Sequence, residues 1–131
     1  MKKSTANWLA TADYDLETAE AMLKSKRYLY VIFMCHLALE KALKGLWAEA
    51  KSEAPPRIHD LLYFLRRLDL TLPGRDADFI AAVNLASVPT RYPEDLAKMV
   101  QLYPYRTARS YLSKTKRVIK WLHKDPRLVR S

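Results

Sequence analysis

Apolar residues along the chain recur at spacings of three and four, the pattern of one helix face. The final segment has this pattern from Tyr105 to Leu122 and predicts a helix over about residues 104–124. No segment shows the strict alternation of a half-buried strand. A helix is likewise predicted over about 5–25, from apolar positions at Leu9, Ala12, Leu16, Ala19 and Leu23.

Three more helices are predicted in the middle of the chain, over about 28–50, 59–69 and 76–87. The helix over 28–50 is apolar on more than one side, so it lies at the centre of the fold or in an oligomer interface. Loops rich in proline are expected at 50–57 and 87–96. The prediction is an all-α, up-and-down bundle of four to five helices, with long first, second and last helices and short third and fourth helices.

Length and composition favour a single domain over residues 1–131. The two glycines are too few for a glycine-rich phosphate loop, and Cys35 has no partner for an intrachain disulfide. His36, His59 and His123 are far apart in the sequence, so no metal or other cofactor is expected. No apolar run reaches the length of a membrane span, and a cytoplasmic protein with no membrane partner is expected.

The formal net charge of +9 is concentrated near the C-terminus. Residues 105–131 carry nine basic side chains and one acidic side chain, whereas residues 1–104 are nearly neutral. This asymmetry favours an anionic partner such as RNA, a nucleotide or an acidic protein, although a solvated helix face would have the same composition. A basic tail is expected at about 125–131, and the final helix carries a basic stripe of Arg106, Arg109, Lys116, Arg117, Lys120 and Lys124.

A polar strip also runs along the otherwise apolar helix over 28–50. Glu40 and Lys44 are four residues apart, which is most simply a salt bridge on the helix surface, and Lys41 lies beside them. The alternative is a strip that lines a groove. His59 would be held at the start of the next helix, where Asp60 can cap the first turn.

Arg91 and Tyr92 are adjacent in a loop stiffened by prolines. An arginine fork can bind an anion, and a neighbouring ring can stack on a base. The alternative is a tyrosine packed on the bundle with the arginine in solvent.

Three motifs in this order, CHLALEKALKGL at 35–46, RIHDL at 57–61 and TRYPE at 90–94, resemble the HEPN family (higher eukaryotes and prokaryotes nucleotide-binding) over about residues 5–124. The resemblance implies a helical bundle that is usually a homodimer and is often encoded beside a minimal nucleotidyltransferase. It also implies a nucleotide binder, a partner of that transferase or, in the toxin branch of toxin–antitoxin systems, a metal-independent ribonuclease. TRYPE is similar to the non-toxin branch.

The main hypothesis is a dimeric module that binds a nucleotide or an anionic RNA segment and acts with a nucleotidyltransferase. Arg91 would bind phosphate, Tyr92 would stack on a base and His59 would donate a hydrogen bond, in a groove that Lys41 and Lys44 also line. The basic stripe would add affinity for phosphates of any sequence.

Two alternatives remain open. Arg117 and His123 have the bare spacing of the toxin branch, with Val118 in place of its usual polar residue. Residues six apart on a helix point about 120° away from each other, so this pair would act on one phosphate only across a dimer. The second alternative is a protein–protein interaction subunit whose basic face binds an acidic transferase.

Overall fold

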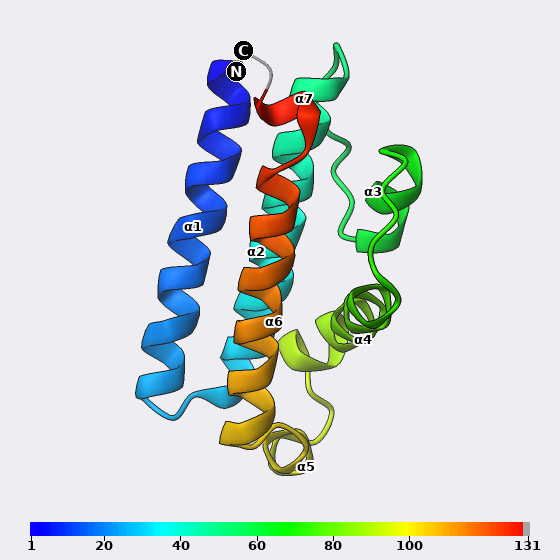
Figure 1. Cartoon of the computed structure of the whole chain (residues 1–131). Helices are drawn as coiled ribbons and strands as arrows, with labels where there is room; N and C mark the ends of the chain where they lie inside the picture. Colours follow the sequence, from blue (N-terminus) through cyan, green and yellow to red (C-terminus); the bar gives the residue numbers. More distant parts are fainter. Residues whose placement is uncertain (130–131) are drawn as a thin grey trace.

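Residues 1–129, which the computed structural model describes, form helices and loops and no strand (Figure 1). The all-α prediction is confirmed, but the number of helices in this part of the chain is seven rather than four to five. Residues 126–129 of the predicted basic tail form the last helix, and Arg130 and Ser131 lie outside the described residues. The helices are α1 (Lys3–Lys24), α2 (Tyr28–Ala50), α3 (Leu61–Arg67), α4 (Gly74–Arg91), α5 (Leu96–Leu102), α6 (Tyr105–His123) and α7 (Pro126–Val129).

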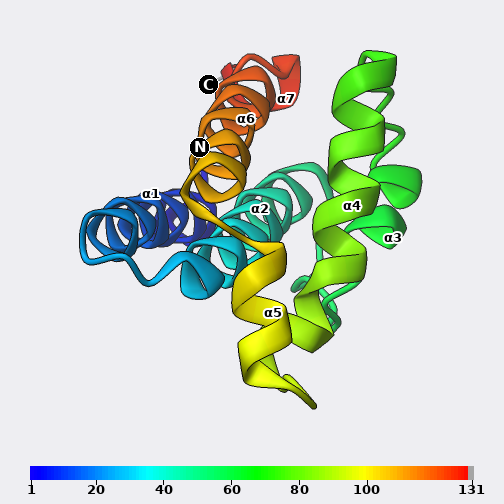
Figure 2. The ribbon, with the colours of Figure 1, turned by 90° about the horizontal axis from the view of Figure 1, so that it is seen from below.

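Helices α1, α2 and α6 lie side by side, with α1 antiparallel to the other two (Figure 1). Helix α4 packs on α2 but runs across it, as the view from below shows (Figure 2). The fold therefore differs from a purely up-and-down bundle, and α4 is a long helix rather than the short one expected. None of the helices in residues 1–129 is long and apolar enough to cross a bilayer.

Helix α2 lies at the centre of the molecule. Fifteen of its 23 residues are buried, because α1, α3, α4, α6 and α7 all pack against it. Its broad apolar surface therefore packs against other helices of the same chain, as expected for a helix at the centre of the fold. Gly45 allows α1 to approach closely: a Cβ atom at this position would lie 3.0 Å from Leu9 Cδ2 and 3.2 Å from Trp8 Cβ.

The segment 87–96, expected to be a loop, contains the last turn of α4 and the start of α5. Helix α4 continues through Pro89 to Arg91. A proline at this position leaves the carbonyl of Leu85 without its helical donor. Leu85 is 81% exposed, so water can supply the missing hydrogen bond.

The short helix α5 is absent from the prediction. Asp95 caps it, with its carboxylate accepting a hydrogen bond from the Lys98 amide. None of the seven residues of α5 is buried, although most of them are apolar. This helix therefore presents apolar surface on the outside of the chain.

Candidate functional site

Helix α6 is strongly amphipathic. Ala108, Leu112 and Ile119 are buried on one side, against α1 and α2. The other side carries the basic stripe, and all six of its residues, Arg106, Arg109, Lys116, Arg117, Lys120 and Lys124, are exposed. The position of the stripe therefore agrees with the helical periodicity of the sequence.

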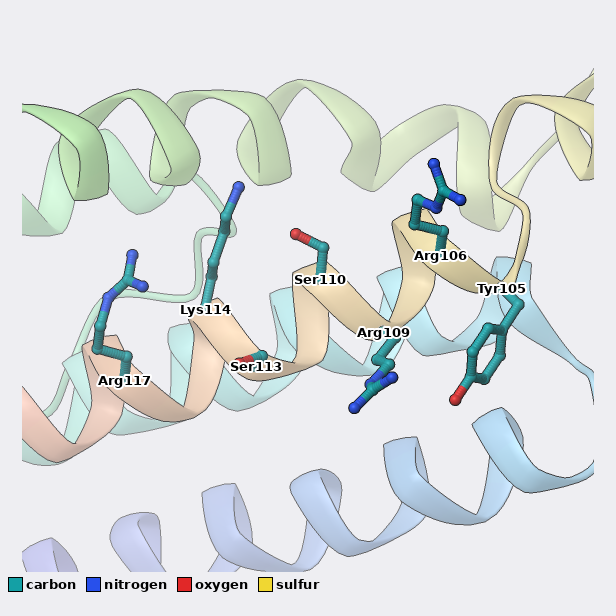
Figure 3. Close-up of a pocket in the computed structure, with 7 residues that line it drawn as sticks. All are labelled: Tyr105, Arg106, Arg109, Ser110, Ser113, Lys114 and Arg117. Carbon is teal, nitrogen blue, oxygen red and sulfur yellow. The ribbon is translucent and has the colours of Figure 1, made fainter.

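An open groove of about 550 Å³ follows this side of α6. Its lining combines positive charge with hydroxyl groups and one aromatic ring. Arg106, Ser110, Lys114 and Arg117 point toward α4, whereas Arg109 and Tyr105 point toward α1 (Figure 3). The groove is lined by Tyr105, Arg106, Arg109, Ser110, Ser113, Lys114 and Arg117.

Four cations line this groove, and only one of them is paired within the described residues. Arg117 donates to Asp76 Oδ1 from Nε, at 3.1 Å, and from Nη2. No carboxylate in residues 1–129 lies within 4.0 Å of the charged groups of Arg106, Arg109 or Lys114. The groove thus holds three uncompensated positive charges, which favour an anion.

A second groove, of about 350 Å³, adjoins the first on the α1 side of α6. Arg109 and Ser113 line both grooves. Lys116 forms an ion pair with Glu20 of α1 in this second groove. The basic surface therefore continues from the α4 side of α6 toward α1.

The sequence-predicted candidates outside α6 gather partly around one internal carboxylate, that of Glu40. Its Oε2 accepts from Lys44 Nζ at 3.0 Å, and its Oε1 lies 2.8 Å from His59 Nδ1. Glu40 is only 4% exposed, so the salt bridge expected on the surface is buried. Glu40 supplies the negative charge that a ligand was expected to bring to these two side chains.

Arg91 lies beside the same cluster, at the end of α4. Its guanidinium carbon is 4.6 Å from the centre of the Phe33 ring, and its Nε and Nη2 atoms are buried without a hydrogen-bond partner in residues 1–129. Burial lowers the pKa of the neighbouring His36, and the charge of Arg91 lowers it further, whereas Glu40 opposes this shift. Arg91 therefore packs inward instead of extending from a loop.

Lys41 and Tyr92 face other surfaces. Lys41 Nζ is 2.8 Å from Asp15 Oδ2 of α1. Tyr92 is 75% exposed and lines a groove of about 510 Å³ between the end of α4 and α5. The structure thus brings His59 and Lys44 together at Glu40, with Arg91 close by, and separates Lys41 and Tyr92 from them.

The residues with potential for catalysis are dispersed. His123 is exposed at the end of α6, while Arg117 is held by Asp76. Burial raises the pKa of the Cys35 thiol to about 12, so this cysteine is not a reactive thiolate. Within residues 1–129, no three His, Cys, Asp or Glu side chains are grouped so as to hold a metal ion.

Four residues of the α6 groove are absent from the predicted basic stripe: Tyr105, Ser110, Ser113 and Lys114. Tyr105 was assigned to the apolar face, and Ser110 and Lys114 were left out of the stripe. The spacing of 106, 110, 114 and 117 places them in one row along the helix, and this row was the signal that could have found them.

The HEPN domain family model matches residues 5–125. Among solved structures, the crystal structure of TT1696 from Thermus thermophilus is similar with a TM-score of 0.81 and 23% identity, over 94% of this chain and 98% of that chain. The structure of ST0689, described as an archaeal HEPN homologue, is similar with a TM-score of 0.70 and 25% identity, over 92% and 96% of the two chains. No curated protein matches the chain.

Proposed function

The chain belongs to the HEPN family, and on this premise we propose that it binds nucleotides or RNA through their phosphates, in the groove along α6. The observation that carries this proposal is the set of three groove cations without a carboxylate partner in residues 1–129: Arg106, Arg109 and Lys114. Phosphates can pair with these three cations without breaking an existing ion pair.

The lining of the groove suits a phosphate chain with attached bases. Arg106 and Lys114 are eight residues apart on one helix, which corresponds to about 12 Å along its axis. Arginine side chains can bind phosphate oxygens in a bidentate manner, and the Ser110 hydroxyl can donate to them. Tyr105, 47% exposed at the start of α6, can stack on a base.

The α6 groove is a better candidate than the site first expected around His59 and Arg91. Glu40 already binds Lys44 and contacts His59, and a phosphate there would meet this buried carboxylate. Lys41 is likewise paired with Asp15. An anion would have to displace these contacts, and the unpaired Arg91 packs against Phe33 with its Nε and Nη2 atoms buried. The α6 groove instead offers cations that line an open groove and are unpaired within the described residues.

The test is a titration of a fluorescent single-stranded RNA of about 12 nucleotides, and of ATP, at low salt. Arg106→Ala combined with Arg109→Ala is expected to weaken RNA binding at least about tenfold and to lower the slope of log affinity against log salt by about two. Arg57→Ala combined with Arg66→Ala is the matched control. This second pair removes the same charge from exposed positions outside α6.

Equal loss of affinity in both double variants would mean that net charge alone governs binding, and it would contradict the proposal. The RNA is expected to remain intact in EDTA throughout the titration. Cleavage that is lost in Arg117→Ala and in His123→Ala would support the ribonuclease alternative instead. The ion pair of Arg117 with Asp76 does not favour that alternative, because it reduces the charge available to a reacting phosphate.

We further propose that the chain forms a homodimer. The contact between the two copies is made by the exposed apolar surface of α4 and α5. Monomers rarely expose large contiguous apolar patches. The adjacent groove contains Glu94 and Asp95 as well as Lys98, so two copies related by a twofold axis can pair these charges. The apolar surface consists of Leu85, Val88, Tyr92, Leu96, Val100 and Leu102, each about half exposed or more.

A nucleotidyltransferase subunit is the other partner that family membership suggests. An acidic face on such a subunit would bind α6, where it would compete with RNA. Co-purification that is lost on charge reversal of Arg106 and Arg109, with no RNA binding by the chain alone, would favour the protein–protein alternative.

A further inference from the structure

Arg117 differs from the other cations of the α6 groove, because a carboxylate holds one edge of its guanidinium. Asp76 Oδ1 accepts from Nε at 3.1 Å and from Nη2. The Arg117 side chain is 41% exposed in the groove, whereas the Asp76 side chain is 8% exposed. The pair therefore joins a buried anion to a cation that faces the proposed ligand.

The Asp76 carboxylate is fixed in place by its surroundings. It lies in the first turn of α4, where the helix dipole stabilises negative charge, and its amide donates to the carbonyl of Pro73 at 2.9 Å. A buried carboxylate that loses its partner is strongly destabilised. A ligand that pulled Arg117 away would have to overcome this loss, so the pair persists when the groove is occupied.

We propose that Asp76 is an internal counter-ion that withholds Arg117 from the ligand. The inference rests on the proposed function of the groove and concerns the regulation of that same site. Phosphates then interact with the three unpaired cations, and the fourth cation contributes little net charge. Asp76 therefore makes the affinity of the groove for a polyanion lower than it would be with all four cations unpaired. The lower affinity favours reversible binding.

The experiment is a double-mutant cycle with Asp76→Asn and Arg117→Ala, using the same 12-nucleotide RNA at several salt concentrations. Asp76→Asn retains a hydrogen-bonding oxygen for Arg117 but removes the charge. It is expected to tighten binding several-fold and to raise the salt slope by about one. Arg117→Ala alone leaves the Asp76 charge unpaired beside the groove and is expected to weaken binding, whereas in combination with Asp76→Asn it is expected to return the affinity to about that of the wild type.

Asp78→Asn is the matched control for net charge. Asp78 is exposed on the same helix and forms no ion pair within residues 1–129. Its substitution is expected to leave affinity and salt slope close to wild type. Circular dichroism melts identify a temperature at which every variant is folded, and Arg117→Gln replaces Arg117→Ala if the latter does not fold, because Gln can still donate to Asp76.

Two results would overturn the inference. One is an Asp76→Asn variant that binds no more tightly than Asp78→Asn. The other is a double variant, Asp76→Asn with Arg117→Ala, that binds as tightly as Asp76→Asn alone. If either occurs while Arg106→Ala and Arg109→Ala weaken binding, only this inference fails. If those two variants bind like the wild type, the proposed function itself fails.

Discussion

Three buried carboxylates each hold a basic side chain from another segment of the chain. Each pair fixes the position of a residue that would otherwise be free to meet a ligand. Positive charge near these carboxylates is therefore structural, and the charge available for binding is concentrated on α6. The pairs are Lys41 with Asp15, His59 with Glu40 and Arg117 with Asp76.

Buried His36 makes stability depend on pH. Its pKa is lowered from 6.5 in the folded chain, because burial disfavours the imidazolium and Arg91 repels it, against the attraction of Glu40. Below pH about 6.5 the unfolded chain takes up the proton more readily than the folded chain does. The stability associated with neutral His36 is thus present above that pH and is lost as the pH falls, by at most about 1.4 kcal/mol per pH unit.

The measurement is urea unfolding of the wild type and of His36→Gln at pH about 7.5 and 5.5. The wild type is expected to lose more of its free energy of unfolding between the two values than His36→Gln. His123→Gln, at the exposed end of α6, is the control and should behave like the wild type. Equal pH dependence of all three proteins would show that His36 does not control it.

The sequence predicted the basic residues of α6 but not their partners. Helical periodicity was sufficient to place Arg117 on the exposed side of the last helix. Its partner Asp76 is 41 residues away, and Lys116 and Glu20 are separated by 96 residues. Such pairs depend on how the helices pack, so charge counting could not distinguish the paired cations from the unpaired ones.

At the scale of the helices, α1 and α2 approach each other closely at Gly45. The nearest side-chain atoms to a Cβ at position 45 would be 3.0 to 3.3 Å away, at Leu9 and Trp8. Gly45→Val is therefore expected to lower the free energy of unfolding by about 1 to 3 kcal/mol through overpacking. Gly74→Val is the control, because its Cβ would meet nothing within 4 Å. Denaturant unfolding that gives equal losses at both positions would contradict the role of close packing.

Periodicity located α1, α2 and α6 and also the short helix α3, but it did not locate α5 or α7. Repeated apolar positions identify α1 and α6, and the buried face of α3 made that short helix recognisable, whereas α5 has no buried face and therefore no apolar stripe to detect. The cap at Asp95 was the available local signal. The sequence predicted that α4 ends at about residue 87, before Pro89, whereas the helix continues to Arg91. The sequence does not show that the Leu85 carbonyl, which loses its donor to Pro89, is accessible to water.

At the scale of the whole molecule, we expect the chain to dimerise through α4 and α5. Leu85→Glu combined with Val88→Glu places two charges on the most exposed part of this apolar surface without altering the core. Light scattering at micromolar concentration is expected to report a dimer for the wild type and a monomer for this variant. Tyr14→Glu, at a 70% exposed position on α1, should remain dimeric. A monomeric wild type would refute the assignment of this surface.

The central position of α2 has a consequence for the synthesis of the chain. Leu39 and Leu43 share one apolar cluster with Val118, Ile119 and Leu122, which are synthesised well after α2. The α1–α2 hairpin can form early, but the opposite side of α2 then stays open to solvent until α6 has emerged. We expect the nascent chain to be most prone to aggregation, and most dependent on chaperones, during this interval.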